Sequence, residues 1–386
     1  MKTTDRSILN ELDNINGYDT ALLTTYNFET SFFEKYILSL LAKHQVRIIN
    51  LFVDAKQLNK ALRTDNSFSL GKNYYVTPIL MNGSFHPKAI LLLGEKRAKL
   101  IISSANIKIS GFIQNNEIFN SFEYTEKNTK YANLISSAIT FFKSLYNVSI
   151  NKDKDVLQKL NEFSVITEEN DSISLLFNTE ISILEQLSEH IHDAVREINI
   201  AVPFYDPCLE ALQEIRKRFN CHSINLYIQN KKNTFPIEYN NKYNIVPEDR
   251  INLFEAVLQG RNKSKMFYHG KVIEFVTDTN SYILYGSSNC SSSALLKTYQ
   301  HFGNIECDVL YRSAVKANYE FFHTFIKGDN TVFENGFLID EKTSDFSEYS
   351  FAYGAKTSDS IMLYLLYKDC IRRFSGAAIA EFPEPL

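Results

Sequence analysis

Short apolar runs of strand length alternate with amphipathic stretches along most of this chain. In the first half, residues 21–26 and 49–54 have the pattern of buried strands, and residues 29–43 between them have the pattern of an amphipathic helix. The second half repeats this order, with strands at 198–203 and 224–229 and a helix at 207–219. Strand–helix–strand units of this length favour mixed or parallel sheets with helices on their faces.

A hairpin is predicted after each of these units. Residues 88–93 and 271–276 are apolar, and each run is followed by a polar turn and a second apolar strand. Alternate residues of a strand lie on one face of the sheet. We therefore expect His86 and Lys88 to share a face in the first half of the chain.

A final helix is predicted near the end of the chain. Residues 358–375 begin with Ser358 and Asp359, either of which can cap a helix. Two arginines stand in the last turn of this stretch, and Gly376 follows it as a terminator. These signals predict a C-terminal helical extension.

Composition indicates a soluble globular protein. The chain has 386 residues, of which 44% are hydrophobic and 22% charged, and its formal net charge is −4. This length suits two domains or two fused half-domains. The five cysteines are odd in number and form no CxxC pair, which favours reduced thiols in the cytoplasm. No signal peptide and no membrane-spanning run are recognisable. The mild acidity gives no general argument for nucleic-acid binding, which would need a local basic patch.

One four-residue motif occurs twice. It is His-x-Lys followed by Ser-x-Asn, and its two copies are His86, Lys88, Ser104 and Asn106, and His269, Lys271, Ser287 and Asn289. Of the eight histidines, only these two are followed by x-Lys, and in both copies the Asn lies 18 residues after the Lys. The copies are 183 residues apart. We therefore predict a duplicated fold with halves at 1–165 and 166–330, followed by the helical extension at 331–386.

The paired motifs resemble those of the phospholipase D superfamily, which are written HxKxxxxD with a downstream GSxN. Leu93 and Val276 stand where that family has its Asp, and Ser103 stands where the first copy would have Gly. Lack of the Asp is similar to the tyrosyl-DNA phosphodiesterase branch and to some restriction endonucleases of the superfamily. The resemblance covers residues 20–126 and 195–310. It implies an α/β fold with two mixed sheets flanked by helices and related by pseudo-twofold symmetry.

Phosphodiester cleavage needs a nucleophile, a proton donor for the leaving oxygen, and positive charge for the phosphoryl oxygens. A neutral imidazole can attack phosphorus and an imidazolium can protonate the leaving group, so two histidines can divide these roles. By resemblance, His86 forms a covalent phosphohistidine and His269 acts as acid and then as base. The residues alone do not distinguish the two.

The other motif residues complete the predicted site. Lys88 and Lys271 supply charge, and the motif serines and asparagines supply neutral donors. By resemblance, a Glu that follows a short Asn-containing stretch orients each imidazole. The candidates are Glu117, eleven residues after Asn106, and Glu306, seventeen residues after Asn289. No metal and no cofactor are expected, and both halves of the site come from one chain.

The resemblance leaves three substrate classes open. The first is nucleic acid, with DNA or RNA cleaved by a cytoplasmic nuclease. Lysines that a phosphate backbone could follow stand near the predicted strand ends, although lysine runs are more often merely solvated: Lys231, Lys232, Lys263 and Lys265. The second class is phospholipid, which requires a membrane-facing apolar surface. The third is a catalytically weak nucleic-acid-binding module of a larger complex.

A partner is also suggested by resemblance. The segment at residues 18–28, and the pair Phe32 and Phe33 after it, is similar to the start of bacterial phospholipase-D-like proteins linked to helicases and phage defence. A helicase or ATPase, or another subunit of a defence system, is therefore a candidate partner beside nucleic acid.

Overall fold

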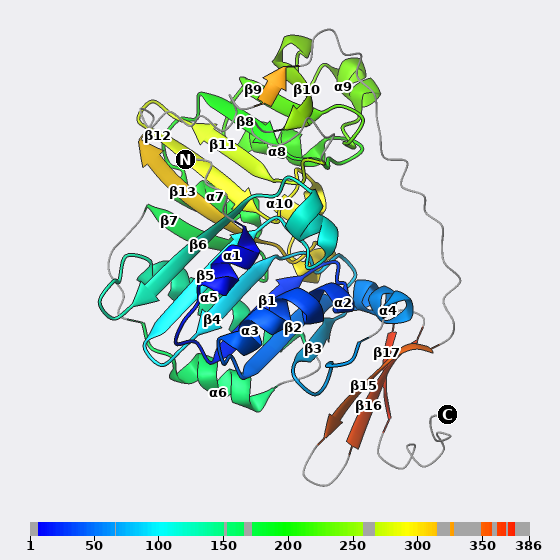
Figure 1. Cartoon of the computed structure of the whole chain (residues 1–386). Coiled ribbons are helices and arrows are strands. Elements are labelled where there is room, and N and C mark those ends of the chain that lie inside the picture. The colour runs from blue at the N-terminus through cyan, green and yellow to red at the C-terminus, as the bar shows by residue number, and fades with distance from the viewer. Residues whose placement is uncertain are drawn as a thin grey trace.

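Two mixed β-sheets form the centre of the molecule (Figure 1). The structure is a computed structural model, and it describes the following residues: 7–65, 67–149, 153–165, 172–257, 267–314, 325–327, 349–356, 361–367 and 370–374.

The first sheet has six strands in the order β3-β2-β1-β4-β5-β6. Their bounds are β1 Thr20–Thr25, β2 Ile48–Asp54, β3 Tyr75–Ile79, β4 Ala89–Leu93, β5 Arg97–Ser103 and β6 Phe119–Thr125. Strands β1, β2 and β3 are parallel to one another, whereas β4 pairs antiparallel with both β1 and β5. The motif residues lie where β4 begins and where β5 ends.

The second sheet repeats this order and adds a strand at each edge, giving β14-β10-β9-β8-β11-β12-β13-β7. Its bounds are β7 Ile173–Phe177, β8 Glu197–Ala201, β9 Ile224–Gln229, β10 Ile251–Val257, β11 Val272–Val276, β12 Asn280–Gly286, β13 Cys307–Ala314 and β14 Phe325–Lys327. Strands β8 to β13 occupy the positions of β1 to β6. The duplication predicted from the two motifs is therefore present in the sheet topology.

Helices cover the sheets (Figure 1). Those of the first half are α1 Ile8–Asp13, α2 Thr30–Phe32, α3 Ser39–Lys43, α4 Ala55–Thr64, α5 Ala132–Val148 and α6 Lys154–Glu162, with π-helical segments at Phe33–Leu38 and Ser110–Gln114. Those of the second half are α7 Ile183–His190, α8 Glu210–Arg218, α9 Ile237–Tyr243 and α10 Ser292–Leu295, with 3₁₀ turns at Glu248–Arg250 and Tyr299–His301.

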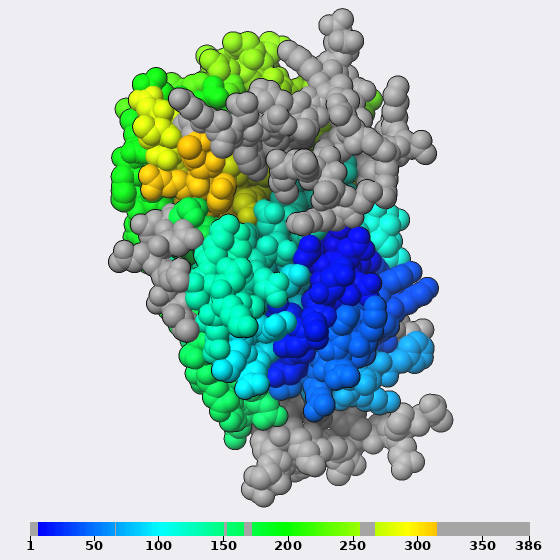
Figure 2. Space-filling view, turned by 60° about the vertical axis from the view of Figure 1, so that its left-hand side comes forward, coloured from blue at the N-terminus to red at the C-terminus, as the bar shows by residue number. Residues whose placement is uncertain are grey.

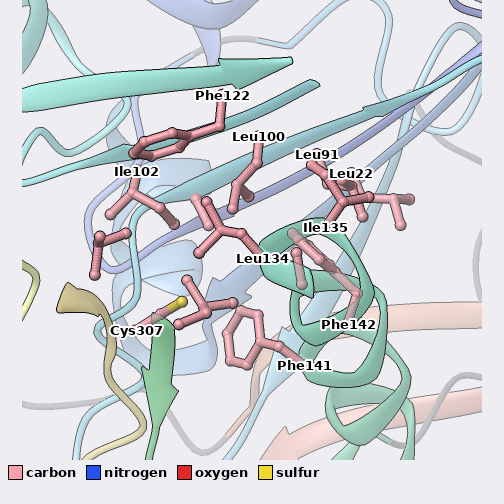
Figure 3. Packing of buried hydrophobic residues seen from close by; sticks show 14 of the residues in the cluster. Leu22, Leu91, Leu100, Ile102, Phe122, Leu134, Ile135, Phe141, Phe142 and Cys307 are labelled. Carbon is pink, nitrogen blue, oxygen red and sulfur yellow. The ribbon is translucent and has the colours of Figure 1, made fainter. Parts of the chain in front are cut away.

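Three clusters of buried apolar side chains fill the spaces between the sheets and helices. The central cluster lies between the sheets, where Leu134, Ile135 and Phe141 of α5 pack with Leu100 of the first sheet and Cys307 of the second (Figure 3). The other two clusters lie between each sheet and its own helices. Burial of this central layer joins the two halves into one body.

Burial on both faces explains the unbroken apolar runs of the central strands. In β4, Leu91 and Leu93 belong to the central cluster, whereas Ile90 and Leu92 belong to the outer cluster under α1 to α4. A strand covered on both sides has no solvent-facing position, so its sequence is continuously hydrophobic. The predicted strands and both hairpins are confirmed. The helix predicted at 29–43 is a continuous helical run whose middle part, Phe33–Leu38, is π-helical.

The predicted final helix is wrong. The described part of 331–386 forms a three-stranded antiparallel sheet of β15 Tyr349–Lys356, β16 Ile361–Tyr367 and β17 Cys370–Phe374. Strand β16 is a run of seven residues with no charged position, and such a short run does not distinguish a helix from a strand. The partner strands decide between them, since Tyr367 pairs with Cys370 across a hairpin.

Candidate active site

Two short backbone bridges join the halves beside the motif histidines. The amide of His86 donates to the carbonyl of Ile305 at 2.9 Å, and the amide of His269 donates to the carbonyl of Asn116 at 2.9 Å. The residue before each histidine forms a parallel bridge with the other half. Each bridge therefore places the histidine of one half beside the Glu-bearing segment of the other half.

The imidazoles and carboxylates are paired crosswise. His86 Nδ1 lies 2.9 Å from Oε2 of Glu306, and His269 Nδ1 lies 2.9 Å from Oε1 of Glu117. All four side chains are nearly buried, with exposed fractions of 12% and 10% for the histidines and 0% and 6% for Glu306 and Glu117. A carboxylate on Nδ1 fixes the tautomer and leaves Nε2 as the reactive nitrogen.

Both glutamates belong to the same local motif, Asn-x-Glu. Asn115 donates its side-chain amide to Glu117 at 3.1 Å, and Asn304 donates its amide to Glu306 at 2.9 Å. The longer interval in the second half is accommodated by the α10 segment, which lies between Asn289 and Glu306. Residue spacing from the motif Asn conceals this equivalence, and the Asn-x-Glu pattern is the sequence signal that reveals it.

The motif lysines are buried behind the histidines. Lys88 and Lys271 have exposed fractions of 2% and 1%. Each donates its Nζ to the carbonyl of its own motif histidine, at 2.5 Å for His86 and 2.6 Å for His269. The backbone at each motif histidine is thus held in the same way in both halves. In each half, the lysine Nζ lies next to the backbone of its histidine.

The motif serines bind protein groups. Ser104 Oγ donates to Oε2 of Glu117 at 2.5 Å and accepts from the amide of Ile118 at 2.9 Å. Ser287 Oγ accepts from the amide of Cys307 at 2.9 Å. In this geometry the two hydroxyls bind the glutamate-bearing segments of the site.

The motif asparagines differ in their contacts. Asn106 Oδ1 accepts from the amide of Asn27 at 3.2 Å. Among the residues that the structure describes, the buried Oδ1 of Asn289 has no hydrogen-bond partner. A buried polar atom without a partner costs free energy, so this oxygen is a candidate acceptor for a bound ligand.

Asp308 is a site carboxylate that sequence reasoning missed. Its Oδ1 accepts from the amides of Ser287 and Ser288 at 2.7 and 2.9 Å, and its Oδ2 accepts from Ser288 Oγ at 2.5 Å. Asp308 is 1% exposed and lies at the start of β13. The first half has Phe119 at the matching start of β6, so comparison of the repeats gives no signal for it.

Asp308 also explains why only the second motif has a glycine before its Ser. Gly286 has φ +153°, and a Cβ at this position would lie 2.6 Å from Asp308 Oδ1. No carboxylate occupies this place in the first half, where Ser103 stands instead. The departure from the family motif at Ser103 is therefore matched by the absence of an aspartate at Phe119.

Burial lowers the pKa of both imidazoles. Desolvation and the charges of Lys88 and Lys271 hold the pKa of His86 well below its usual value. Desolvation and the Lys271 charge lower the pKa of His269 to about 4, although Glu117 opposes this shift. Burial likewise lowers the pKa of Lys271 to about 8 and that of Lys88 well below its usual value.

The carboxylates shift in opposite directions. Burial favours the neutral form of Glu117, but His269 and Lys271 outweigh it and lower the pKa of Glu117 to about 2. Burial raises the pKa of Glu306 to about 7. Burial and the nearby Glu306 charge raise the pKa of Asp308 to about 7. The two histidine–glutamate pairs are therefore alike in their hydrogen bonds and differ in their charge.

The four lysines predicted to follow a phosphate backbone are only partly covered by the structure. Lys231 and Lys232 lie on the loop after β9; Lys231 is exposed and Lys232 half-buried. Lys263 and Lys265 lie outside the described residues. Within the described part of the chain there is no group of three or more His, Cys, Asp or Glu side chains that could hold a metal ion. None of the described helices is long and apolar enough to cross a membrane.

Comparison with known proteins shows which fold this chain has. No family model matches the sequence, and no curated protein matches it. The structure is similar to yeast tyrosyl-DNA phosphodiesterase, with 13% identity, a TM-score of 0.52, and coverage of 78% of this chain and 84% of that chain. A histidine-to-alanine variant of the yeast protein matches with 13% identity and a TM-score of 0.53 over 78% and 85% of the two chains. This chain has the duplicated phospholipase-D-like fold.

The expected fold class is thereby confirmed. Two mixed sheets with flanking helices are arranged as two copies of one unit, as in that fold. Identity of this size shows the fold alone, so arguments about activity and substrate have to come from the side chains of the site.

One face of the molecule, with the first half below the second, is seen in Figure 2.

Proposed function

We propose that this protein is a phosphodiesterase that cleaves nucleic acid through a covalent phosphohistidine. The observation that carries the proposal is the crossed pair of buried histidines, each with a glutamate on Nδ1 and a lysine behind it. Two imidazoles that are each held at Nδ1 by a carboxylate can serve through Nε2 as nucleophile and as acid, which is the minimum that a two-step displacement at phosphorus requires.

In the proposed first step, Nε2 of His86 attacks phosphorus and the bond from phosphorus to the leaving oxygen breaks. His269 donates its Nε2 proton to that oxygen. In the second step, water gives a proton to His269 and attacks phosphorus, and the phosphorus–nitrogen bond breaks. His86 is then free again, so atoms and charges balance over the cycle. Lys88 and Lys271 stabilise the charge on the phosphoryl oxygens.

The charge asymmetry supports this assignment of roles. Glu117 has a pKa lowered to about 2, so it stays ionised and favours an imidazolium at His269. Glu306 has a pKa raised to about 7, so it gives less support to a positive charge at His86. A bound phosphodiester anion offsets the Lys271 charge, which is one cause of the low pKa of His269. Substrate binding therefore raises the pKa of the proposed acid.

Nucleic acid is the proposed substrate class on three grounds. The fold is that of a protein named for action on a DNA phosphodiester, and both motif copies lack the Asp of the typical phospholipase pattern. Aromatic rings also border both histidines, from Tyr26 beside His86 and from Phe204 and Phe267 beside His269. A cytoplasmic setting stays a prediction from the cysteine pattern, and a helicase or other defence-system partner stays a prediction from the resemblance.

A cleavage assay in EDTA tests the proposal. The purified chain is incubated with single-stranded DNA, duplex DNA, RNA and phosphatidylcholine vesicles. We expect cleavage of at least one nucleic acid to persist in EDTA and to vanish in His86→Ala. Turnover of the lipid alone would overturn the proposal. Tight nucleic-acid binding with no turnover of any substrate would favour the binding-module alternative.

Trapping the intermediate tests the roles of the histidines. In His269→Ala, the hydrolysis step lacks its base, so a phosphoenzyme at His86 should accumulate on a substrate with a good leaving group. Mass spectrometry of the denatured protein locates the phosphoryl group. Accumulation at His269 in the His86→Ala variant would exchange the two roles.

A further inference from the structure

The two halves place different side chains at one matched position beside the histidines. Each half has a parallel bridge between the residue after its motif Asn and the loop after β1 or its counterpart β8, at Phe28–Ile107 and at Tyr205–Cys290. Aligning these bridges puts Phe204 of the second half at the position of Asn27 of the first. A polar amide on one side of the site is therefore replaced by a ring on the other side.

A second matched position shows the same replacement. The carbonyl of Ser84 accepts from the amide of Ile305 at 3.0 Å, and the carbonyl of Phe267 accepts from the amide of Asn116 at 2.8 Å. Both carbonyls belong to the residue two before a motif histidine. Phe267 thus takes the place of Ser84, and the second half has phenylalanine at both positions where the first half has a small polar side chain.

The two rings lie together against His269. Their centroids are 6.2 Å from the imidazole centroid for Phe204 and 5.4 Å for Phe267, and they are 6.3 Å from each other. Both residues are half-buried. The ring pair therefore forms an aromatic wall next to the imidazole on this side of the site.

The His86 side differs. There, Tyr26 contacts the imidazole edge to face with a centroid distance of 5.3 Å, and its hydroxyl accepts a hydrogen bond from Gln57 Nε2 at 3.0 Å. This ring is held by a polar tether and stands at the position of Pro203. The two histidines therefore have different surroundings, with a tethered tyrosine at His86 and two phenylalanine rings at His269.

We infer that Phe204 and Phe267 form a stacking site for the nucleobase of the nucleotide on the His269 side of the scissile phosphate; this inference rests on the proposed function. Phenylalanine offers no hydrogen bond to a phosphate or a sugar, but its ring stacks on any base. Because His269 protonates the leaving oxygen, the stacked base belongs to the departing nucleotide.

Abasic substitution on each side of one phosphate tests the site. The substrate is a short DNA strand with a single cleavable phosphodiester, its other linkages being methylphosphonates. One isomer lacks the base on the 5′ side of that phosphodiester and the other lacks the base on the 3′ side. We expect one isomer to lose about 10-fold to 100-fold in kcat/KM, as loss of one stacked base implies, and the other to react nearly as the parent does.

Variants of the protein show which residue causes the difference in kcat/KM between the two abasic isomers. Phe204→Leu and Phe267→Leu keep an apolar side chain and remove the ring face, so each should reduce the ratio of kcat/KM between the two isomers towards one. Tyr26→Leu is the matched control on the His86 side, and its ratio should equal that of the wild type. A ratio is insensitive to the fraction of folded enzyme, so weak folding of a variant does not obscure the result.

Several outcomes would overturn the inference while leaving the proposed function intact. One is equal cleavage of both isomers by the wild type, and another is a ratio that collapses only in Tyr26→Leu. A third outcome concerns a substrate in which tyrosine is joined to thymidine by a phosphodiester. If cleavage of this substrate depends on Phe204 while the two abasic isomers react equally, the rings bind a tyrosine leaving group and not a nucleobase. If no DNA or RNA is cleaved at all, it is the proposed function that fails.

Discussion

At the scale of single residues, each histidine depends on a carboxylate from the other half. His86 is oriented by Glu306 and His269 by Glu117, over equal distances. The pKa values of the two carboxyls nevertheless move apart, to about 7 and about 2. Substitution of one glutamate should therefore affect one chemical step more than the other.

Glu117→Gln should slow hydrolysis of the intermediate. The amide keeps the shape of the side chain but cannot stabilise the imidazolium of His269, so a phosphohistidine at His86 should accumulate. The loss in turnover should be about 10²-fold to 10⁴-fold, the usual contribution of a general acid or base. Glu306→Gln should reduce kcat/KM without accumulation, because it weakens the attacking imidazole. Accumulation only in Glu306→Gln would contradict the assignment.

Lys271 should produce an alkaline limb in the pH profile. Burial lowers the pKa of its ammonium to about 8, so the charge is present below this pH and is lost above it. We expect kcat/KM to fall as the pH rises through about 8. In Lys271→Arg the guanidinium stays charged, so the drop above pH 8 should shrink. An unchanged drop in the arginine variant would show that another group titrates there.

At the scale of elements, the turn after β12 differs from its counterpart after β5. Asp308 holds this turn through two backbone amides and one hydroxyl, and Gly286 leaves the space that its carboxylate needs. The equivalent turn of the first half is organised by Ser103, whose Oγ accepts from the amide of Ala105 at 2.8 Å. The two turns are thus held by different side chains, and only the second has a positive φ at its first position.

Two substitutions of Asp308 separate its hydrogen bonds from its charge. Asp308→Ala leaves two buried amides and one hydroxyl without an acceptor, so the free energy of unfolding should fall by about 3 kcal/mol or more. Asp308→Asn keeps one oxygen for the two amides, and its stability in urea denaturation should stay near that of the wild type.

Titration of Asp308 gives a second readout. Its folded pKa of about 7 lies above the ordinary carboxyl value, so protonation stabilises the fold at low pH and this stability is lost as the pH rises towards 7. Asp308→Asn should therefore lose less stability than the wild type between pH 5 and about 7.5. A steeper loss in the asparagine variant would refute this account.

At the scale of the whole molecule, one chain carries both halves of the site. The parallel bridges at His86 and His269 and the crossed glutamates all join residues of the first and second halves within one polypeptide. The shared apolar layer around α5 fixes the sheets relative to each other. In neither half does the motif histidine lie in the same half as the glutamate that binds its Nδ1.

The full chain should therefore be active as a monomer. We expect the rate per chain to be constant on dilution, as checked by an activity assay beside analytical ultracentrifugation over the same concentrations. The control is a one-to-one mixture of His86→Ala with His269→Ala, which should stay inactive because complementary halves on different chains do not meet. Activity that falls through a dimerisation midpoint, or recovery in the mixture, would contradict a one-chain site.

Much of the fold and of the site follows from local pattern. Buried strands are recognisable because burial on both faces demands continuous apolar runs, as in β4. The hairpins bring His86 and Lys88 to the strand end opposite Asn106 because alternation and a short turn leave few other registers. The equal spacing of the motif copies suffices to predict a duplicated unit. The final helix was wrong because the pattern of residues 361–367 suits two structures and their partner strands lie outside any local window.

By itself, the sequence determined which residues are candidates for the chemistry, the duplication of the unit that holds them, and the strands that position them. Only the tertiary structure decided that Glu117 serves His269 and Glu306 serves His86, because this pairing depends on bridges between segments more than 150 residues apart. It also decided that Asp308 belongs to the site and that phenylalanines border one histidine. Such contacts form where the two halves pack together. The free energy of that packing depends on residues from both halves, so no single stretch of the sequence predicts it.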